Sequence, residues 1–297
     1  MPNNKYIPKI FEKFYKKEFD LDYISYKILG IKIRKNKNKE IPNLADLRCY
    51  QMASTIHKNL EKYRGIYTNK NILIIGGGPS LQYLDVIPKN CIKIGINRAY
   101  KLKNIDFDYL FAQDKFPNKD ESIEFAEYNQ ETCTKFFGIH ALNNNYRIRQ
   151  NIISRAKKKE IYILNSRRPI DGLATIDISM EPIMRFNATV FSVLQFVLFT
   201  NPSNIYLAGF DCTDYGHAFR NDCENFNLFS QYEYWKQFKK YKELFFEENK
   251  IISINPINLK GMFDDIYTES FVNTHKNLKN KNIEILNKGE NLKWINL

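Results

Sequence analysis

The chain has 297 residues, a formal net charge of +12 and 43% hydrophobic residues. That length allows one large domain or two small ones. No apolar run reaches the roughly 18 residues of a membrane span, and the N-terminus lacks the long apolar stretch of a secretory signal. We therefore expect a cytoplasmic protein, and the composition argues against an integral membrane or exported one.

The positive charge is spread along the chain as lysine rather than packed into one arginine stripe. This spread favours solvated lysine faces, and no recognised nucleic-acid-binding motif is present, so we expect no nucleic-acid partner. Attraction to phosphorylated substrates or to the anionic inner leaflet is the functional alternative. The five cysteines are widely spaced without a CxxC pair, and reduced thiols are expected.

Residues 1–70 are expected to form a helical appendage. Residues 9–19 and 44–63 carry apolar and aromatic residues at helical spacing, separated by a short apolar run and a basic, polar loop. Packing of this region on the main domain is the first expectation. Self-association and contact with a membrane surface remain the alternatives.

The stretch NILIIGGGPSL at residues 71–81 is the most informative of the chain. Its apolar start predicts a buried strand, and Pro79 and Ser80 open an expected helix, where proline suits the first turn. Three glycines between strand and helix would let a phosphate approach bare backbone N–H groups at the positive end of a helix. We therefore predict a phosphate site at Gly76, Gly77 and Gly78. The stretch matches GxGxxG only in part, and an ordinary strand-to-helix turn is the alternative.

Strand and helix patterns alternate after this loop. Further strands are expected at residues 91–97, 106–114, 133–142, 160–166, 204–211 and 251–256. Residues 188–200 are apolar nearly all round and predict a buried helix, and residues 231–250 predict an amphipathic one. This alternation predicts an α/β fold with a mostly parallel sheet covered by helices on both faces over residues 71–263. Residues 264–297 are expected to form a polar tail.

Polar residues follow several of these strands at their carboxyl ends. Ligands bind beyond the carboxyl ends of the strands in open parallel sheets. We expect one shared crevice lined by the glycine loop and by the residues Asn97, Arg98, Gln113, Asp114, Asp211 and Thr213.

A family resemblance rests on four blocks in order: GGGPSL, GINRAYKL, DYLFAQD and SVLQFVLFTNPSNIYLAGFDCT. Their order resembles that of the bacterial sialyltransferases of glycosyltransferase family 42. It also resembles the motility accessory factors and archaeal 6-hydroxymethylpterin diphosphokinases. Both groups imply a Rossmann-like sheet, and the resemblance covers roughly residues 71–260.

The sialyltransferase resemblance implies transfer of sialic acid or a related nonulosonic acid from a CMP-activated donor to a cell-surface glycan, without a required cofactor. It implies that the donor is held by Gly76, Gly77, Gly78, Pro79, Ser80, Asn97, Asn187, Ala188, Thr189, Gly209 and Asp211, with Thr213 near the place of a family tyrosine. The family's catalytic histidine has no counterpart in residues 229–231. We therefore predict His217 or Asp114 as the base, with His140 as runner-up.

The second group implies a diphosphokinase in which Asp114 and Asp211 hold Mg²⁺ against a diphosphate. A third reading is a non-catalytic nucleotide-binding protein of envelope glycan assembly. Under the leading reading, the partners are a nucleotide-activated sugar donor and a glycan or glycolipid acceptor. Peripheral contact with the inner membrane and a homo-oligomer are left open.

Overall fold

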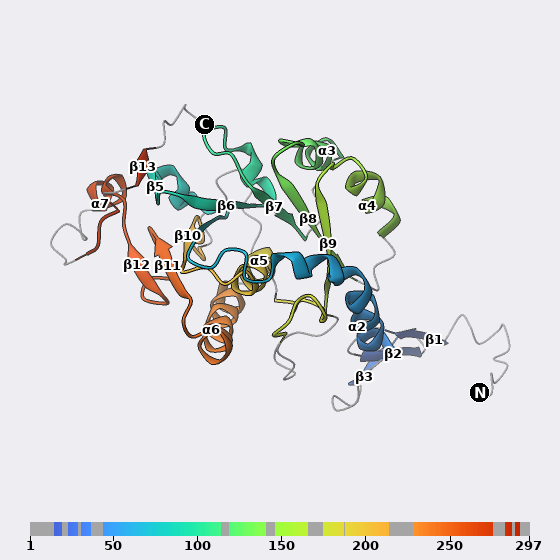
Figure 1. Cartoon of the computed structure of the whole chain (residues 1–297). Coiled ribbons are helices and arrows are strands. Elements are labelled where there is room, and N and C mark those ends of the chain that lie inside the picture. The colour runs from blue at the N-terminus through green and yellow to red at the C-terminus, as the bar shows by residue number, and fades with distance from the viewer. Residues whose placement is uncertain are drawn as a thin grey trace.

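An eight-stranded, fully parallel sheet runs through the computed structural model (Figure 1). The structure describes residues 15–19, 23–28, 31–36, 44–113, 119–140, 146–165, 175–186, 188–213, 228–275, 283–286 and 289–291. The strand order is β12-β11-β10-β4-β6-β7-β8-β9. The strands are β4 (Asn71–Ile75), β6 (Cys91–Ile96), β7 (Tyr109–Ala112), β8 (Thr134–His140), β9 (Lys159–Leu164), β10 (Asn204–Ala208), β11 (Lys250–Ile254) and β12 (Asp264–Ile266).

The sheet is covered on both faces, which confirms the predicted α/β fold class. Ile72 and Ile74 of β4 join a core with η1 (His57–Tyr63), α5 (Thr189–Phe199) and α6 (Leu228–Phe245). Leu73 and Ile75 point to the other face, where α2 (Leu44–Ile56), α3 (Lys119–Glu127) and α4 (Tyr146–Ile153) pack. Continuous apolar strands are typical of a parallel sheet buried on both sides.

The α5 helix is buried along its whole length, as its apolar sequence predicts. Each of its 11 residues lies in the interior. The sequence is hydrophobic nearly all round, because the helix lies between the sheet and α6 and has no face left for solvent. The amphipathic helix expected over residues 231–250 is also present, as α6.

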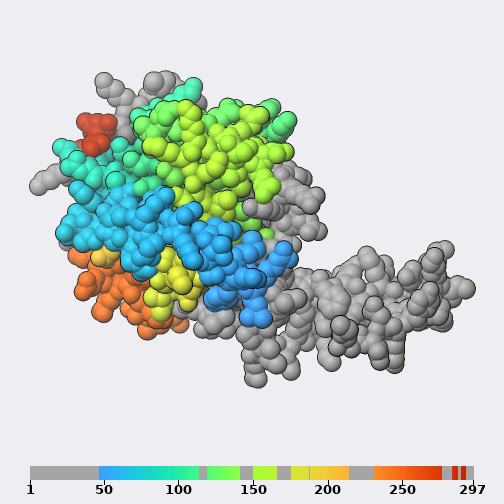
Figure 2. All heavy atoms as spheres, turned by 45° about the vertical axis from the view of Figure 1, so that its right-hand side comes forward, coloured from blue at the N-terminus to red at the C-terminus, as the bar shows by residue number. Residues whose placement is uncertain are grey.

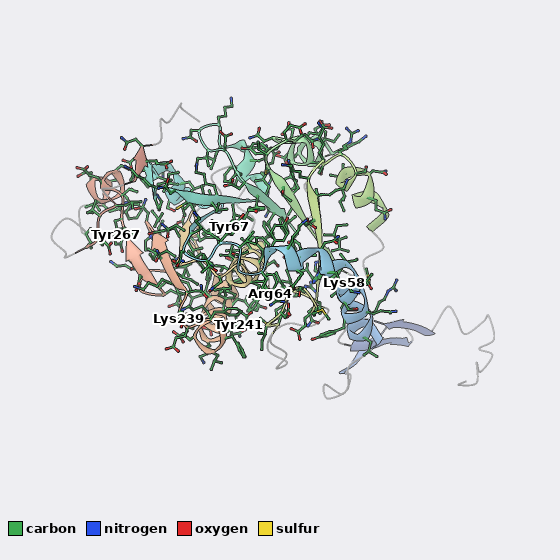
Figure 3. All side chains as sticks on the ribbon, viewed as in Figure 1. Lys58, Arg64, Tyr67, Lys239, Tyr241 and Tyr267 are labelled. Atoms are coloured by element: carbon green, nitrogen blue, oxygen red, sulfur yellow. The ribbon has the colours of Figure 1, made fainter. Side chains whose placement is uncertain are left out.

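The segment 44–63 packs on the main domain, as expected. His57, Leu60 and Tyr63 of η1 are buried, and Figure 2 shows residues 47–70 as a blue band across the surface of the molecule. Arg64, which follows η1, contacts Asp177 with 2.7 Å between Nη2 and Oδ2. Tyr241 of α6 donates from its hydroxyl to the Thr175 carbonyl at 2.6 Å. The side chains of Arg64 and Tyr241, labelled in Figure 3, thus connect residues 175–186 to η1 and α6.

The helix expected over residues 9–19 is wrong for its described part. Tyr15–Phe19 is a strand, β1, which pairs antiparallel with β2 (Tyr23–Ile28), and β2 pairs antiparallel with β3 (Ile31–Asn36). The residues Tyr15 and Phe19 share one side at a period of two as well as of four, so spacing alone did not decide between helix and strand. Pairing with β2 decides it.

The sequence beyond residue 263 adds an edge strand to the sheet before its polar stretch. β12 pairs with β11. It is followed by α7 (Glu269–Thr274), which Thr268 caps by accepting a hydrogen bond from the Phe271 N–H. A small antiparallel pair joins β5 (Val86–Ile87) to β13 (Glu290–Asn291). No helix in the described parts of the chain is both long and apolar enough to cross a bilayer.

Candidate functional site

The order of the strands reverses between β4 and β10. From β4 the chain adds β6, β7, β8 and β9 in one direction, and α5 then carries it back to β10 on the other side of β4. The carboxyl ends of β4 and β10 therefore form the topological switch point, where open α/β sheets bind ligands. The glycine loop and the segment from Gly209 to Thr213 both lie at this point.

The glycine loop is hydrogen-bonded to the end of β10. The amide of Gly76 donates to the Ala208 carbonyl at 2.9 Å, and that of Gly78 donates to the Gly209 carbonyl at 2.8 Å. A Cβ on Gly76 would lie 2.6 Å from the Gly209 oxygen, and one on Gly78 would lie 2.4 Å from Asp211 Oδ2. These two glycines are thus required for close approach of two chain segments. The sequence analysis explained the missing side chains at Gly76 and Gly78 by room for a phosphate. The structure shows that they are instead needed for contact with Gly209 and Asp211.

Asp211 places its carboxylate against the glycine loop. Its Oδ2 accepts the Ser80 backbone N–H at 2.7 Å, and its side chain is 3% exposed. Burial raises the pKa of Asp211 above its ordinary value, and hydrogen bonds from the Ser80 hydroxyl and amide partly oppose that rise. The backbone N–H of Asn258 donates to the Asp211 carbonyl at 3.1 Å and so holds this segment in place.

The helix expected after the loop is a single 3₁₀ turn, η2 (Pro79–Tyr83), with Pro79 at its start as predicted. Such a turn is too short to supply the field of an α-helix. The Leu81 amide donates to the Gly78 carbonyl at 3.2 Å. Gly77 is therefore the loop residue whose amide remains for a ligand, because the described residues supply it with no acceptor.

Arg98 pairs with Glu121 of α3, and its predicted role at the phosphate stays a prediction. Its Nη2 lies 2.8 Å from Glu121 Oε2 and its Nε lies 3.1 Å from both carboxylate oxygens. Lys101 adds a 2.7 Å contact to the same carboxylate. These hydrogen bonds lower the pKa of Glu121 to about 2. Asn97, at the carboxyl end of β6, adopts a left-handed conformation with φ of 52° and starts η3 (Asn97–Lys101).

Gln113 joins the end of β7 to α5. The Ser192 hydroxyl donates to Gln113 Oε1 at 2.9 Å, and both residues are buried. The first turn of α5 therefore lies beside the carboxyl end of β7. Its N-cap is Ala188, which makes no side-chain cap. The start of α5 therefore brings the positive end of its helix dipole to this edge.

The structure describes only some of the remaining predicted site residues. Asp114, Asn187 and His217 lie outside the described residues. The Thr213 hydroxyl is buried and makes no hydrogen bond among the described residues. Gly209 adopts a φ of 74°, and a Cβ there would lie 2.7 Å from the Leu81 side chain. Sequence reasoning missed the contributions of Ser192, Asn258 and Glu121, because their roles depend on partners far along the chain.

Of the histidines, His57 is a satisfied core residue. Its Nδ1 lies 2.9 Å from the Glu181 carbonyl, and its Nε2 accepts the Ile163 N–H at 2.6 Å. Burial lowers its pKa to about 4. His140 ends β8, and its catalytic role stays a prediction.

Comparison with known proteins gives one structural likeness. No family model matches the chain, and no curated protein matches it. The chain is similar to a solved structure described as that of the MAf glycosyltransferase from Magnetospirillum magneticum AMB-1, with a TM-score of 0.46 and 12% sequence identity. The likeness covers 86% of this chain and 40% of that one, so the chain spans about two fifths of its length.

Proposed function

We propose that the protein is a glycosyltransferase that uses a nucleotide-activated sugar. We propose a CMP-linked sialic acid or related nonulosonic acid as the donor, and a cell-surface glycan or glycolipid as the acceptor. Support comes from the switch point between β4 and β10 and from the sequence blocks described above. The donor class rests on the sequence resemblance.

The start of α5 carries this proposal, through the positive end of its helix dipole. A helix N-terminus attracts the phosphate of a ligand because its dipole is positive at that end. Ala188 and Thr189 stand there, at the place where the resemblance implies donor contacts. We assign the donor phosphate to this turn and to the Gly77 amide. Gly76, Gly78 and Ser80 have a supporting role, because their amides are already donated within the fold.

The chemistry follows from this placement. The acceptor hydroxyl attacks the anomeric carbon of the sugar, and the bond from that carbon to the phosphate oxygen breaks. Its electron pair leaves with CMP, and the positive end of α5 stabilises the charge that develops on the leaving phosphate. The proton of the acceptor hydroxyl passes to a base, for which His217 and Asp114 remain our predictions.

The experiment that tests the proposal is a nucleotide-binding screen by thermal shift and calorimetry, with CMP, CMP-sialic acid, UDP-sugars and ATP, each with and without Mg²⁺. Stabilisation by the cytidine ligands without Mg²⁺, together with transfer to a glycan acceptor, is the expected result. Binding without turnover would instead support the non-catalytic reading. Stabilisation by ATP that requires Mg²⁺ would contradict the proposal in favour of the diphosphokinase. That alternative needs Asp211 as a cation ligand, and here its carboxylate accepts the Ser80 N–H.

A further inference from the structure

Most of the exposed apolar side chains come from three segments of the chain. The described residues include seven large hydrophobic side chains that are exposed, and five of them are Ile66, Ile176, Met180, Leu244 and Phe245. Leu244 is 76% exposed, the largest fraction of the seven. Single exposed hydrophobic side chains are ordinary, whereas a contiguous group of them marks an interaction site. The contacts between the three segments therefore decide what these side chains mean.

Tyr241 brings the end of α6 next to the segment 175–186. Its hydroxyl donates to the Thr175 carbonyl at 2.6 Å, and Thr175 immediately precedes Ile176. Its ring centroid lies 5.6 Å from that of Phe245, one helical turn further along α6. The exposed side chains of α6 and of this segment therefore lie on neighbouring parts of one surface.

Arg64 joins the same segment to the end of η1. Its Nη2 lies 2.7 Å from Asp177 Oδ2 and 3.1 Å from Ser179 Oγ. Ile66 follows Arg64 by two residues, and Met180 follows Ser179. Because the guanidinium and the carboxylate already pair with each other, a partner can cover them without leaving an unpaired charge. We call the five exposed side chains of this surface the apolar patch: Ile66, Ile176, Met180, Leu244 and Phe245.

The outer face of α6, beside the apolar patch, carries a charge pattern that is complementary to itself. A helix turns about 100° per residue, so Lys236, Lys240, Glu243 and Glu247, just beyond the end of α6, lie along one stripe. All four are exposed. Within the described residues, Lys236 pairs with Glu233 at 2.8 Å, and no ion pair involves the other three. The two positive charges precede the two negative ones along the stripe.

We propose that the apolar patch and this stripe form the interface of a symmetric dimer of two copies of the chain. Two helices related by a two-fold axis perpendicular to them run antiparallel, and each contact occurs twice. One register of two α6 helices places Lys240 of each copy opposite Glu243 of the other. The same register places Lys236 opposite Glu247. The two apolar patches then lie on the same side of the helix pair, where they cover each other.

The charges of the stripe favour a second copy over an anionic partner. Two lysines and two glutamates have no net charge, so the stripe has no net attraction for a phospholipid surface or a nucleic acid. A parallel pair of α6 helices would set lysine against lysine and glutamate against glutamate, so the pattern also selects the antiparallel arrangement. Burial of the apolar patch supplies the driving force. The inference does not depend on the proposed catalytic activity.

Analytical ultracentrifugation of the full chain tests the proposal. The wild type should be mostly dimeric at about 100 μM and should dissociate on dilution. Leu244→Asp buries an unpaired charge in the interface and should weaken the dimer at least about 100-fold. Leu47→Asp makes the same change at an exposed leucine of α2 outside the patch and should leave the dimer unchanged. Circular dichroism verifies that each variant is folded.

Charge reversal on the stripe tests the register. Lys240→Glu and Glu243→Lys each create two like-charged pairs in a symmetric dimer, so each should weaken it at least about tenfold. The double variant with both reversals restores opposite charges and should dimerise as the wild type does. An equimolar mixture of the two single variants should also dimerise, because each supplies the charge that the other lacks.

Four results would overturn the proposal. The first is a wild type that is still monomeric at about 100 μM. The second is equal weakening by Leu47→Asp and Leu244→Asp, and the third is a double charge reversal that dimerises no better than the single ones. The fourth is a monomer that floats with lipid vesicles and loses this binding in Leu244→Asp, because the patch would then belong to a membrane contact.

Discussion

The glycine loop after β4 has a structural role that its sequence pattern does not reveal. Gly76 and Gly78 allow close contact with Gly209 and Asp211. Glycines after a buried strand indicate close approach to the backbone. The structure gives that approach to the chain itself, through the Gly209 carbonyl and the Asp211 carboxylate. Sequence correctly predicted that side chains are excluded at these positions. It could not identify the approaching group, because residues 76 and 211 meet only in the folded sheet.

The neighbouring positions Gly77 and Gly78 separate ligand binding from folding. Gly78→Ala places a Cβ 2.4 Å from Asp211 Oδ2 and should lower the free energy of unfolding by about 1–3 kcal/mol. Gly77→Val should leave the melting temperature near that of the wild type and weaken nucleotide binding at least about tenfold by blocking the approach of the phosphate. Calorimetric titration and thermal melts measure both effects. Unchanged affinity in folded Gly77→Val would remove the loop from the ligand site.

His57 makes stability depend on pH. Its pKa in the folded state, about 4, lies below the ordinary 6.5, so folding favours the neutral ring. Its contribution is complete above pH 6.5 and is lost as the pH falls towards 4. His57→Ala leaves the Ile163 N–H and the Glu181 carbonyl without this partner and should cost about 3 kcal/mol at pH 7.

Urea unfolding at pH 7 and pH 4.5 checks this prediction. The difference in free energy of unfolding between wild type and His57→Ala should narrow at the lower pH, because the wild type alone pays for protonating a buried ring. Leu60→Ala removes a buried side chain of η1 that does not titrate, and is a control that should show no such narrowing. An equal difference at both pH values would contradict the assignment.

At the scale of elements, α5 and β1 illustrate what periodicity decides. The run of 11 residues in α5 is apolar nearly all round, and its length and composition predict a buried helix. Tyr15–Phe19 fits a helix and a strand equally, and its structure depends on a partner strand. The turn after the glycine loop is similar: Pro79 indicates a helical start, but Leu84 ends the turn after Tyr83.

The start of α5 can be tested by giving it a cap. Ala188→Asp and Ala188→Asn both supply a side-chain acceptor at the N-cap of α5, and each should stabilise the protein by about 0.5–2 kcal/mol. The aspartate also brings negative charge to the proposed phosphate site. Nucleotide affinity should therefore fall by at least about tenfold in Ala188→Asp, and by less in Ala188→Asn. Thermal melts and calorimetric titration of this matched pair separate the two effects. Equal affinity in wild type and Ala188→Asp would place the phosphate elsewhere.

At the scale of the whole molecule, the N-terminal region divides in two. β1, β2 and β3 form their own sheet, whereas η1 contributes Leu60 and Tyr63 to the central core. The sequence predicted one appendage up to residue 70, a boundary that stays a prediction. The packing of η1 shows that the core begins before β4.

Two truncations test this division. Removal of residues 1–43 should leave the melting temperature of the remainder within a few degrees of the wild type. Removal of residues 1–63 takes away His57, Leu60 and Tyr63, and deletion of buried side chains costs about 2–5 kcal/mol each. We expect the longer truncation to be insoluble or unfolded by circular dichroism. A stable, folded product from the longer truncation would show that η1 is dispensable to the core.

The sequence by itself determined the fold class, the buried strands and α5, because the hydrophobic periods of strand and helix are local properties that a single chain segment displays. It also determined that glycines are required after β4. The tertiary structure alone decided that Asp211 accepts a hydrogen bond from this loop, that Arg98 pairs with Glu121 and that the first turns of α5 lie beside Gln113. Each of these facts depends on segments brought together across the sheet, and local periodicity carries no information about such partners.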